Sequence, residues 1–522
     1  MSLARNVTTV GAATLLSRLL GFVRDAGTAA LLGAGPLSDA FFAALQIPNL
    51  FRRLLAEGAL NSAFVPMWMR IRDEGGEDAT RRFSEEVLGA MAIIMSAMAV
   101  LCMMFAPAIV GILAPGFRGQ GDRFPLAVAF VRLAVPYVAV SGVVAVASAA
   151  LNAAGRVVAA ALGIAIFNAV LATAVLGLIA SGAPPSFHAA AFLSAMMAVA
   201  GAAQLACVGI AWLRLDSRPS RLPFGLRPEV RRFLVQALPG VVASGIPQLK
   251  LMAGAMVASS SQAAVSWLYY ANRLYELPLG VIAVAVATVL GPVIAASVRS
   301  DDSARTAGAQ SRALEIALGL SLPAAIALAV LSTPIAGGLF ERGAFGPRDT
   351  AMVAAALAAI SAGLPGHSLE KVMGAVSFAH EDTRTPMVAA LCGLVAAVAG
   401  AVALFPRYGH IGIAAAIAAS GWIGATLLTA IVWRRGWLRI DAAARRRLPR
   451  IFLAATVMGT FVAVAALTAT PGLTATATGR IAALTVLVTT GLILYAAGLH
   501  VLGVVSVPDL VRAVREGSRI GR

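Results

Sequence analysis

The sequence predicts an all-α protein that crosses a membrane about fourteen times. Apolar residues make up 59% of its 522 residues and charged residues only 12%, about half of the ~25% charged residues that soluble domains carry. The mean hydropathy is +0.86. Apolar runs of the ~20 residues that a bilayer-spanning helix needs recur between short polar clusters. Together these features indicate a polytopic membrane protein.

The expected spans are the apolar runs between turn and charge clusters. They lie at residues 7–33, 38–69, 84–113, 125–153, 157–181, 187–212, 232–257, 263–297, 311–339, 350–379, 386–405, 410–433, 450–469 and 479–506. Five prolines fall inside them, at Pro48, Pro66, Pro247, Pro278 and Pro292. Because proline removes a helical hydrogen bond, we expect several of these helices to be bent or broken.

The arginines predict the orientation of the chain. With the N-terminus inside, 27 cationic residues fall in inner segments, six in outer segments and eight within the spans. An excess of Lys and Arg on the cytoplasmic side is the rule for membrane proteins, so both termini are expected in the cytoplasm. The net charge of +17 then reflects topology and attraction to anionic lipid, and nucleic-acid binding is not expected.

An internal repeat with an offset of 226 residues predicts two similar lobes. Residues 40–66 align with residues 266–292, because both runs begin with aromatic residues and end in proline. Six spans separate them, so the two lobes point the same way across the membrane. We expect six-helix lobes at 1–213 and 233–435, joined by a cytoplasmic linker at 214–232. Helices 13 and 14 follow at 436–508, and a basic tail at 509–522.

Common catalytic and metal-binding motifs are absent from the sequence. Cys102, Cys207 and Cys392 stand alone in apolar runs, and the five histidines are scattered. There is no phosphate-binding G-x-x-x-x-G-K-[ST] loop, H-E-x-x-H, C-x-x-C or G-x-S-x-G. We therefore expect no metal, no cofactor and no ATP hydrolysis. Arg18 and Arg24 interrupt any cleavable signal, so the first span is expected to remain in the protein.

Charged residues inside the spans predict the functional site. The eight cations there are Arg18, Arg24, Arg52, Arg53, Arg132, Lys250, Arg273 and Lys371. An arginine at mid-bilayer depth costs roughly 2.5–3.5 kcal/mol on insertion scales. A chain that keeps so many is expected to turn them toward a central water-filled cavity and to bind an anion there.

Local ion pairing is the alternative explanation for these charges. The spacing allows three pairs on one helix face: Arg18 with Asp25, Arg53 with Glu57, and Arg273 with Glu276. For Arg53 we favour a structural pair. For Arg24, Arg52 and Arg273 we favour a ligand role, because pairing leaves the cationic excess unexplained. Arg132 follows a polar outer loop and is interpreted as an interfacial anchor.

The two lysines stand out in a chain that otherwise uses arginine. Lys250 and Lys371 are its only lysines, and both fall within spans. A lysine offers a compact, titratable charge where arginine offers a planar fork, which favours a site role for Lys371 and, less strongly, for Lys250. The alternative is that both reach for the membrane surface.

Several motifs resemble one family. They are L-L-S-R-L-L-G-F-V-R-D at 15–25, G-A-G-P-L-S-D-A-F-F at 33–42 and I-P-N-L-F-R-R-L-L-A-E-G-A at 47–59. They are similar to the lipid II flippases of the MurJ or MviN family, within the multidrug/oligosaccharidyl-lipid/polysaccharide exporter superfamily. S-W-L-Y-Y-A-N-R-L-Y-E-L-P-L-G at 266–280, K-V-M-G at 371–374 and E-D-T-R-T-P at 381–386 are also similar. The resemblance covers nearly the whole chain.

The resemblance implies two lobes around a cationic cavity that carries lipid II, an undecaprenyl-diphosphate-linked disaccharide pentapeptide, outward across the bacterial cytoplasmic membrane by alternating access. By matching position, the implied substrate-binding residues are Arg18, Arg24, Arg52, Arg273, Lys371, Asn49 and Ser266. The implied gate residues or charge partners are Asp25, Asp39, Glu57 and Glu276. Helices 13 and 14 would hold the polyprenyl tail, and membrane lipid and cell-wall synthesis proteins would be partners.

One position departs from that pattern. Asn272 stands where some members of the family have an aspartate beside the second-lobe arginine. A proton or cation role of that carboxylate is therefore doubtful in this chain. The identity of a coupling cation or anion is left open by the sequence.

The chemistry of such a substrate agrees with the charges independently. Transferring an isolated ion from water into an apolar medium costs tens of kcal/mol of free energy, so a lipid diphosphate needs a charged path through the membrane. Arginine forks bind phosphate oxygens with two hydrogen bonds at once. The inside-negative potential favours export of an anion by about 2.3 kcal/mol per charge per 100 mV, without ATP.

Three other functions remain open from the sequence. An exporter of drugs or of another polyprenyl-diphosphate-linked saccharide predicts fewer arginines and an acidic cation site. A membrane glycosyltransferase or ligase acting on the same lipid needs a catalytic acid outside, where the short loops offer only Asp122, Glu341 and Asp349. A scaffold for cell-wall assembly is the third.

Overall fold

A computed structural model describes residues 3–56, 59–215, 228–300, 302–468 and 476–504 of the chain. All regular structure in these ranges is helical. Ten of the described helices are long and apolar enough to cross a membrane, which confirms the all-α polytopic class. The helices form two compact units that divide between Ala263 and Ala264.

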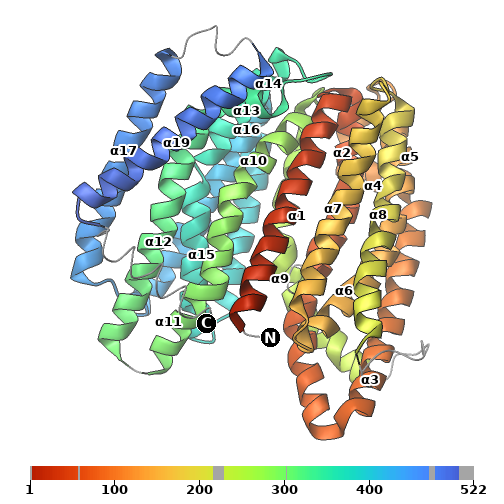
Figure 1. Cartoon of the computed structure of the whole chain (residues 1–522), viewed down its shortest axis with the longest axis horizontal. Coiled ribbons are helices and arrows are strands. Elements are labelled where there is room, and N and C mark those ends of the chain that lie inside the picture. The colour runs from red at the N-terminus through yellow and green to blue at the C-terminus, as the bar shows by residue number, and fades with distance from the viewer. Residues whose placement is uncertain (1–2, 57–58, 216–227, 301, 469–475, 505–522) are drawn as a thin grey trace. The chain divides into compact units, whose positions relative to one another are not determined.

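The first unit contains nine α-helices and one short 3-10 turn among the described residues. They are α1 Leu3–Leu32, α2 Pro36–Ala56, α3 Ala59–Met104, α4 Ala106–Leu113, η1 Pro115–Phe117, α5 Arg123–Ala134, α6 Pro136–Ala153, α7 Val157–Ala180, α8 Phe187–Leu213 and α9 Pro228–Ala258. Figure 1 shows α1 lying along α7, its main packing partner. α6 lies among α2, α3, α7 and α8, so it forms the centre of the unit.

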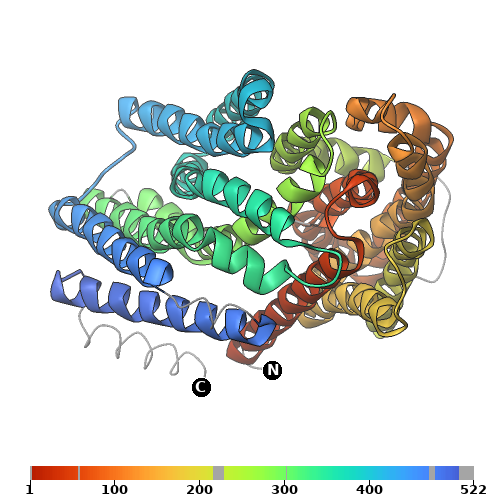
Figure 2. The same cartoon turned by 90° about the horizontal axis from the view of Figure 1, so that it is seen from above.

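The second unit follows the same plan and adds helices at its end. Its elements are α10 Ala264–Ala285, a π-helical segment η2 Val286–Leu290, α11 Gly291–Arg299, α12 Ser303–Val330, α13 Ser332–Phe340, α14 Pro347–Ser361, α15 Leu364–Ala379, α16 Arg384–Arg434, α17 Ala442–Thr468 and α19 Ala477–Val501. α17 packs on α12 and α19, which lie beside it in Figures 1 and 2. Inside α16, Gly409 has φ 57° and ψ −142°, so this element contains both predicted spans 386–405 and 410–433.

The 226-residue repeat is visible in the helix bounds. Moved by 226, α1 spans 229–258 and α9 spans Pro228–Ala258. The part of α3 after its break at Gly76 moves to 303–330, the bounds of α12. α4 moves to 332–339, where α13 spans Ser332–Phe340. The repeat therefore extends well beyond the one pair of aligned segments from which we inferred it.

The compact units do not divide where the repeat does. α9 is the repeat counterpart of α1, yet it packs against α2, α3 and α4 of the first unit. That unit therefore runs to Ala263, beyond the expected start of the second lobe at 233. Within the expected linker, residues 228–232 already belong to α9, while residues 216–227 and the predicted tail at 509–522 lie outside the described ranges.

Several predicted spans are divided differently in the structure. The second one, 38–69, includes residues 57–58, which lie outside the described ranges. The third, 84–113, passes from α3 into α4, which has a proline in its first turn. Pro48, Pro66 and Pro278 lie within continuous helices, whereas Pro292 follows the π-helical segment at the start of α11. A π-turn accommodates the proline because it opens the hydrogen-bond ladder there.

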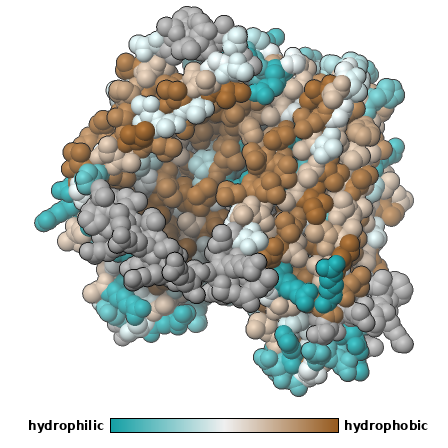
Figure 3. All heavy atoms as spheres, in the orientation of Figure 1, coloured by the Kyte–Doolittle hydropathy of each residue, from teal (hydrophilic) through white to brown (hydrophobic). Residues whose placement is uncertain are grey.

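Apolar side chains cover the helix surfaces as the membrane requires. On the face shown in Figure 3, apolar residues occupy the middle lengths of the helices and hydrophilic residues gather at their ends. Large apolar side chains such as Leu467, Val486 and Leu492 are 87%, 64% and 64% exposed. In water such a surface would be unfavourable, so it faces hydrocarbon.

A buried ion pair holds one end of the first unit together. Asp39, in the first turn of α2, is fully buried, and Arg123 at the start of α5 is 1% exposed. Arg123 Nη1 lies 3.4 Å from Asp39 Oδ2 and donates to the carbonyl of Ser261. The N–H of Ala263, whose φ is +63°, donates to the same Asp39 oxygen at 2.7 Å. The carboxylate thus connects α2, α5 and the segment after α9.

Arg123 is one of the six cationic residues that the expected topology places in outer segments, and the structure adds that its side chain is buried. The guanidinium carbon lies 4.8 Å from the Phe117 ring centroid, so its face is covered as well. Asp39 was expected to be a gate residue or charge partner, and its partner is Arg123. The sequence offers no local signal for this pair, because 84 residues separate the two side chains.

A close approach of two backbones lies beside the ion pair. The N–H of Gly116 donates to Ser259 Oγ at 2.9 Å. A Cβ atom at Gly116 would lie 2.3 Å from the backbone nitrogen of Ser260, so only glycine fits there.

We therefore expect Gly116→Ala to destabilise the first unit, because backbone at Ser260 cannot move away as a flexible side chain can. Overpacking of this kind typically costs about 1–3 kcal/mol. The measurement is the thermal unfolding midpoint of the detergent-purified protein. Gly177→Ala on α7 is the control, because nothing lies within 4 Å of a Cβ there; a drop as large as that of Gly116→Ala in this control would contradict the prediction.

Removing one partner of the buried pair should also lower stability strongly. Arg123→Leu leaves the Asp39 carboxylate buried without its cation, which costs about 3–5 kcal/mol in other proteins. The double variant Asp39→Val with Arg123→Leu removes both charges and should recover at least half of that loss. Unfolding of the two variants and the wild type in the same detergent tests this, and a double variant less stable than Arg123→Leu would argue against a coupled pair.

Candidate functional site

Arg24 is held on two sides and remains accessible. Its Nε and Nη2 groups donate to Asp25 Oδ1 at 2.9 and 2.7 Å, and its Nη1 group donates to Asn168 Oδ1 at 3.2 Å. Asp25 is 2% exposed, whereas Arg24 keeps 21% of its side chain exposed. A guanidinium has five N–H groups, and these contacts use three. Within the described part of the chain, two N–H groups of Arg24 remain for a ligand.

Asn168 is the residue of this site that the sequence analysis missed. It lies on α7, and its amide nitrogen donates to the carbonyl and hydroxyl oxygens of Ser17 on α1 at 3.2 and 3.1 Å. Its amide oxygen accepts a hydrogen bond from Arg24, which lies seven residues, about two turns, beyond Ser17 on α1. Asn168 therefore fixes the direction of the Arg24 fork. A polar residue in an otherwise apolar span was the only signal for it.

The ion pair that the structure shows at Asp25 is with Arg24, its neighbour in the chain. The helical spacing had suggested Arg18 as the partner of this aspartate. Arg18 is partly buried, as are Arg52 and Asn49 on α2. α2 ends its described part at Ala56, so Glu57 and its expected pairing with Arg53 lie outside the described residues.

In the second unit, α10 carries the other candidate arginine. Arg273 Nη1 lies 3.9 Å from Glu276 Oε2, so the expected i,i+3 pair forms, although at a long distance. Both side chains remain about a quarter exposed, at 25% and 24%. A pair at 3.9 Å between partly exposed groups contributes little stability. Ser266, one of the predicted binding residues, is fully buried on the same helix.

α15 brings further polar groups to α10, beside Tyr275. Tyr275, two residues after Arg273, hydrogen-bonds through its hydroxyl to His367 Nδ1 at 2.8 Å. Glu276 and Glu370 both lie near enough to interact electrostatically with Tyr275. Lys371 is exposed, one position beyond Glu370. Tyr275, His367 and Glu370 were not predicted, because α10 and α15 meet only in the folded unit.

The repeat gives Lys250 a counterpart. Moved by 226 positions, Arg24 falls on Lys250, which is 7% exposed on α9. The first helix of each repeat thus carries a cation at the same place. The two repeats therefore both have a positive charge at this position. It is a planar guanidinium in the first repeat and a compact ammonium group in the second.

The E-D-T-R-T-P motif forms the turn between α15 and α16. Asp382 accepts hydrogen bonds from the N–H groups of Arg384 and Thr385 at 2.9 and 3.0 Å, and it also pairs with Arg435. Desolvation raises the pKa of the Asp382 carboxyl, but the hydrogen bonds from Thr385, Arg435 and Arg384 outweigh it and lower the pKa to about 2. The motif is therefore a permanently ionised cap for α16.

Two of the carboxylates that were expected in outer loops are engaged in holding helix ends. The Glu341 carboxylate accepts hydrogen bonds from Arg480 Nη1 on α19 and from the hydroxyl of Thr350, both at 2.7 Å. Asp349 accepts a hydrogen bond from the indole N–H of Trp267 at 3.0 Å. Among the described residues, no group of three or more His, Cys, Asp or Glu side chains is arranged to hold a metal ion.

Comparison with known proteins agrees with this arrangement. A family model described as "Lipid II flippase MurJ" matches residues 28–496. A "Probable lipid II flippase MurJ" of Rhizobium meliloti (strain 1021) is 42% identical over 470 residues, which are 89% of this chain and 87% of that protein. A "Lipid II flippase MurJ" of Burkholderia cenocepacia is 31% identical over 84% of this chain and 87% of its own.

Solved structures show the same fold. A structure titled "Lipid II flippase MurJ, inward closed conformation" has a TM-score of 0.79 at 22% identity, over 96% of this chain and 99% of that one. An inward-facing multidrug-resistance MATE transporter of the MOP superfamily has a TM-score of 0.63 at 15% identity, over 81% and 94%. The family match over most of the sequence and the shared fold lead to one conclusion: this chain belongs to the MurJ family of lipid II flippases.

Proposed function

We propose that this chain carries lipid II from the inner to the outer leaflet of the bacterial cytoplasmic membrane by alternating access, with both termini in the cytoplasm. The observation that supports the proposal most directly is that two partners hold the Arg24 side chain in place. Asp25 and Asn168 set its direction and leave part of its fork accessible. A fork with a fixed direction binds phosphate oxygens with less loss of side-chain entropy than a free one.

The diphosphate of the substrate supplies the matching charge. Arg18, Arg24 and Arg52 would contribute to its binding from the first unit, and Arg273 and Lys371 from the second. Arg24 and Arg273 are each paired with a carboxylate, yet they keep 21% and 25% of their side chains exposed. This favours a ligand role over pairing that only holds helices together.

The other proposed features follow from the same chemistry. The apolar outer surfaces of α17 and α19 are suited to the polyprenyl tail, since Val457 and Ile493 are 61% and 63% exposed. The membrane potential would supply the driving force, with a coupling ion as a further contributor. We propose a transporter and no bond-making step, and interaction with cell-wall synthesis proteins on the outer side.

The test is the sidedness of lipid II in cells depleted of this protein. We expect lipid II to accumulate in the inner leaflet, out of reach of a membrane-impermeant label, and to become labelled again when the chain is restored. Unchanged labelling during depletion would contradict transport. Loss of product formation with normal labelling would instead indicate an enzyme.

The arginines give the sharpest test at the level of single residues. Arg24→Ala, Arg52→Ala and Arg273→Ala should each abolish complementation of a depleted strain, while membrane levels of the protein stay normal. Arg→Lys should fail at two or more of these positions, because lysine lacks the bidentate fork. Arg132→Ala is the control, since Arg132 is exposed and bonds only the Met103 carbonyl among the described residues. Growth with any alanine variant removes that arginine from the site.

Lys371 is expected to act as a point charge and not as a membrane-surface anchor. Lys371→Gln should lose function and Lys371→Arg should keep part of it at best, whereas an anchoring lysine tolerates arginine. Complementation with protein levels measured in parallel separates the two roles. If both variants support growth at wild-type levels, Lys371 is not a site residue.

A further inference from the structure

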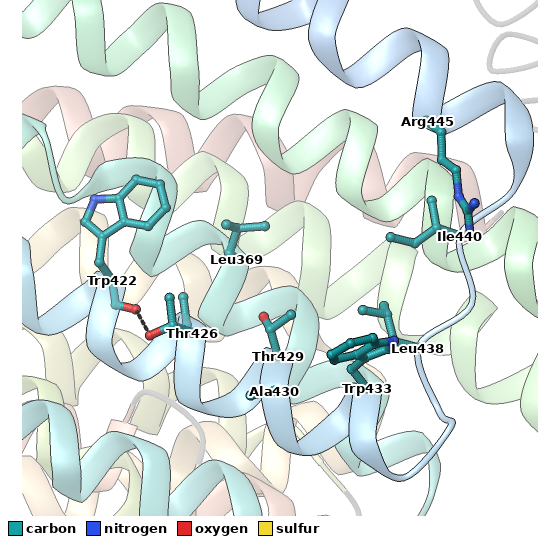
Figure 4. Close-up of a pocket in the computed structure, with 10 residues that line it drawn as sticks. Leu369, Trp422, Thr426, Thr429, Ala430, Trp433, Leu438, Ile440 and Arg445 are labelled. Carbon is teal, nitrogen blue, oxygen red and sulfur yellow. Dashed lines mark hydrogen bonds between the residues drawn. The ribbon is translucent and has the colours of Figure 1, made fainter.

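A groove lies between the second half of α16 and α17. α16 packs on α14 and α15, whereas α17 packs on α12 and α19, so the two consecutive helices diverge and the segment 435–441 connects them. The groove has a volume of about 540 Å³. Figure 4 shows its lining: Trp422, Thr426, Thr429 and Trp433 along α16, Leu369 from α15, and Arg445 from α17.

The length and lining of the groove suit one acyl chain. Trp422 and Trp433 are eleven residues apart on α16, which is about 16 Å along a helix. That is close to half of the ~30 Å hydrocarbon thickness of a bilayer, or one leaflet. The two indoles are 41% and 70% exposed, and between them the wall is formed by small and apolar side chains such as Ala430 and Leu369. Tryptophans commonly lie at the level of lipid headgroups.

One end of the groove carries an unbalanced positive charge. Residues 434–450 contain seven arginines and one acidic residue, Asp441. Asp441 caps α17 by accepting the N–H of Ala444 at 2.7 Å. Two other carboxylates of this unit pair with arginines of this segment, Asp382 with Arg435 and Glu315 with Arg447.

Arg445 is the cation that reaches this groove. Figure 4 shows its side chain extending from α17 toward Ile440 at the Trp433 end. No side-chain hydrogen bond or ion pair of Arg445 occurs within the described ranges. The groove therefore ends at an arginine with capacity for a phosphate.

The segment that closes this end is held in place. Gln310 on α12 donates to the carbonyl of Trp437 at 2.9 Å and accepts the N–H of Arg439 at 2.8 Å. Ser311 Oγ accepts the N–H of Asp441 at 3.0 Å. Trp437 stacks on His380 with ring centroids 4.4 Å apart. Four hydrogen-bonding and stacking contacts thus fix the position of Leu438 and Ile440 in the groove wall.

We propose that this groove binds an anionic phospholipid, with one acyl chain along Trp422, Thr429 and Trp433 and the headgroup phosphate on Arg445. Basic pockets between transmembrane helices bind acidic lipid headgroups in this way. The lipid fills the gap that the divergence of α16 and α17 opens and so joins α17 to the rest of the second unit.

The experiment is native mass spectrometry of the detergent-purified full chain, titrated with dioleoylphosphatidylglycerol or zwitterionic dioleoylphosphatidylcholine. We expect phosphatidylglycerol to bind at least tenfold more tightly. Arg445→Gln should weaken its tightest site about tenfold, equivalent to 1.4 kcal/mol. Arg446→Gln is the matched control, because it removes the same charge from an exposed position that does not line the groove.

A second pair of variants tests the acyl-chain part. Thr429→Trp fills the groove and should abolish the tightest site, whereas Ile423→Trp, on the same helix outside the groove, should not. Unfolding midpoints of all variants in lipid-free detergent verify that they fold. If a variant does not fold, quenching of Trp422 and Trp433 fluorescence by bromine-labelled phosphatidylglycerol in the wild-type protein, with and without competing unlabelled lipid, gives the same answer.

Three results would overturn the proposal. Equal binding of the two lipids, with no effect of Arg445→Gln, would mean an apolar surface without headgroup recognition. Equal weakening by Arg445→Gln and Arg446→Gln would mean diffuse attraction to the basic segment. Displacement of phosphatidylglycerol by a stoichiometric amount of undecaprenyl diphosphate would assign the groove to the transported lipid.

Discussion

The cost of placing charge in an apolar medium governs this structure. A buried ionic group needs a partner or access to water, because its desolvation costs several kcal/mol even after relaxation. The chain meets this requirement in two ways. Asp39 and Arg123 are 0% and 1% exposed and pair with each other, although Arg123 Nε and Nη2 have no hydrogen-bond partner among the described residues, while Arg24 and Arg273 are paired and still partly exposed. Only the second arrangement leaves charge for a ligand.

This difference separates scaffold from site within one set of polar residues. The Asp39 carboxylate connects three segments of the first unit and has no exposed surface for a substrate. Arg24 has its direction set from α7 through Asn168. Removing a scaffold charge costs folding energy, whereas removing a site charge costs binding energy, so stability and transport measurements distinguish the two.

The repeat supplies a common scaffold on which the two units differ in charge. α3 after Gly76 and α12 have equivalent bounds, as do α4 and α13 within one residue. Yet Arg24 corresponds to Lys250, and the buried Arg123 corresponds to Asp349, which binds Trp267. The added helices α17 and α19 have no counterpart among the described helices of the first unit, and the divergence of α17 from α16 creates the groove that we assign to a phospholipid.

The sequence by itself determined the membrane class, the approximate helices, the repeat and the family, because hydropathy, charge distribution and motif are properties of contiguous residues. The arginines at 18, 24, 52 and 273, which we propose as site residues, were identifiable for the same reason. Asn168, Arg123 and the Tyr275–His367 contact were decided only by tertiary structure, since their partners are 144, 84 and 92 residues away. The sequence also could not predict that α9 packs with the first unit. A repeat shows which segments are similar, but it does not show which apolar helix faces pack together.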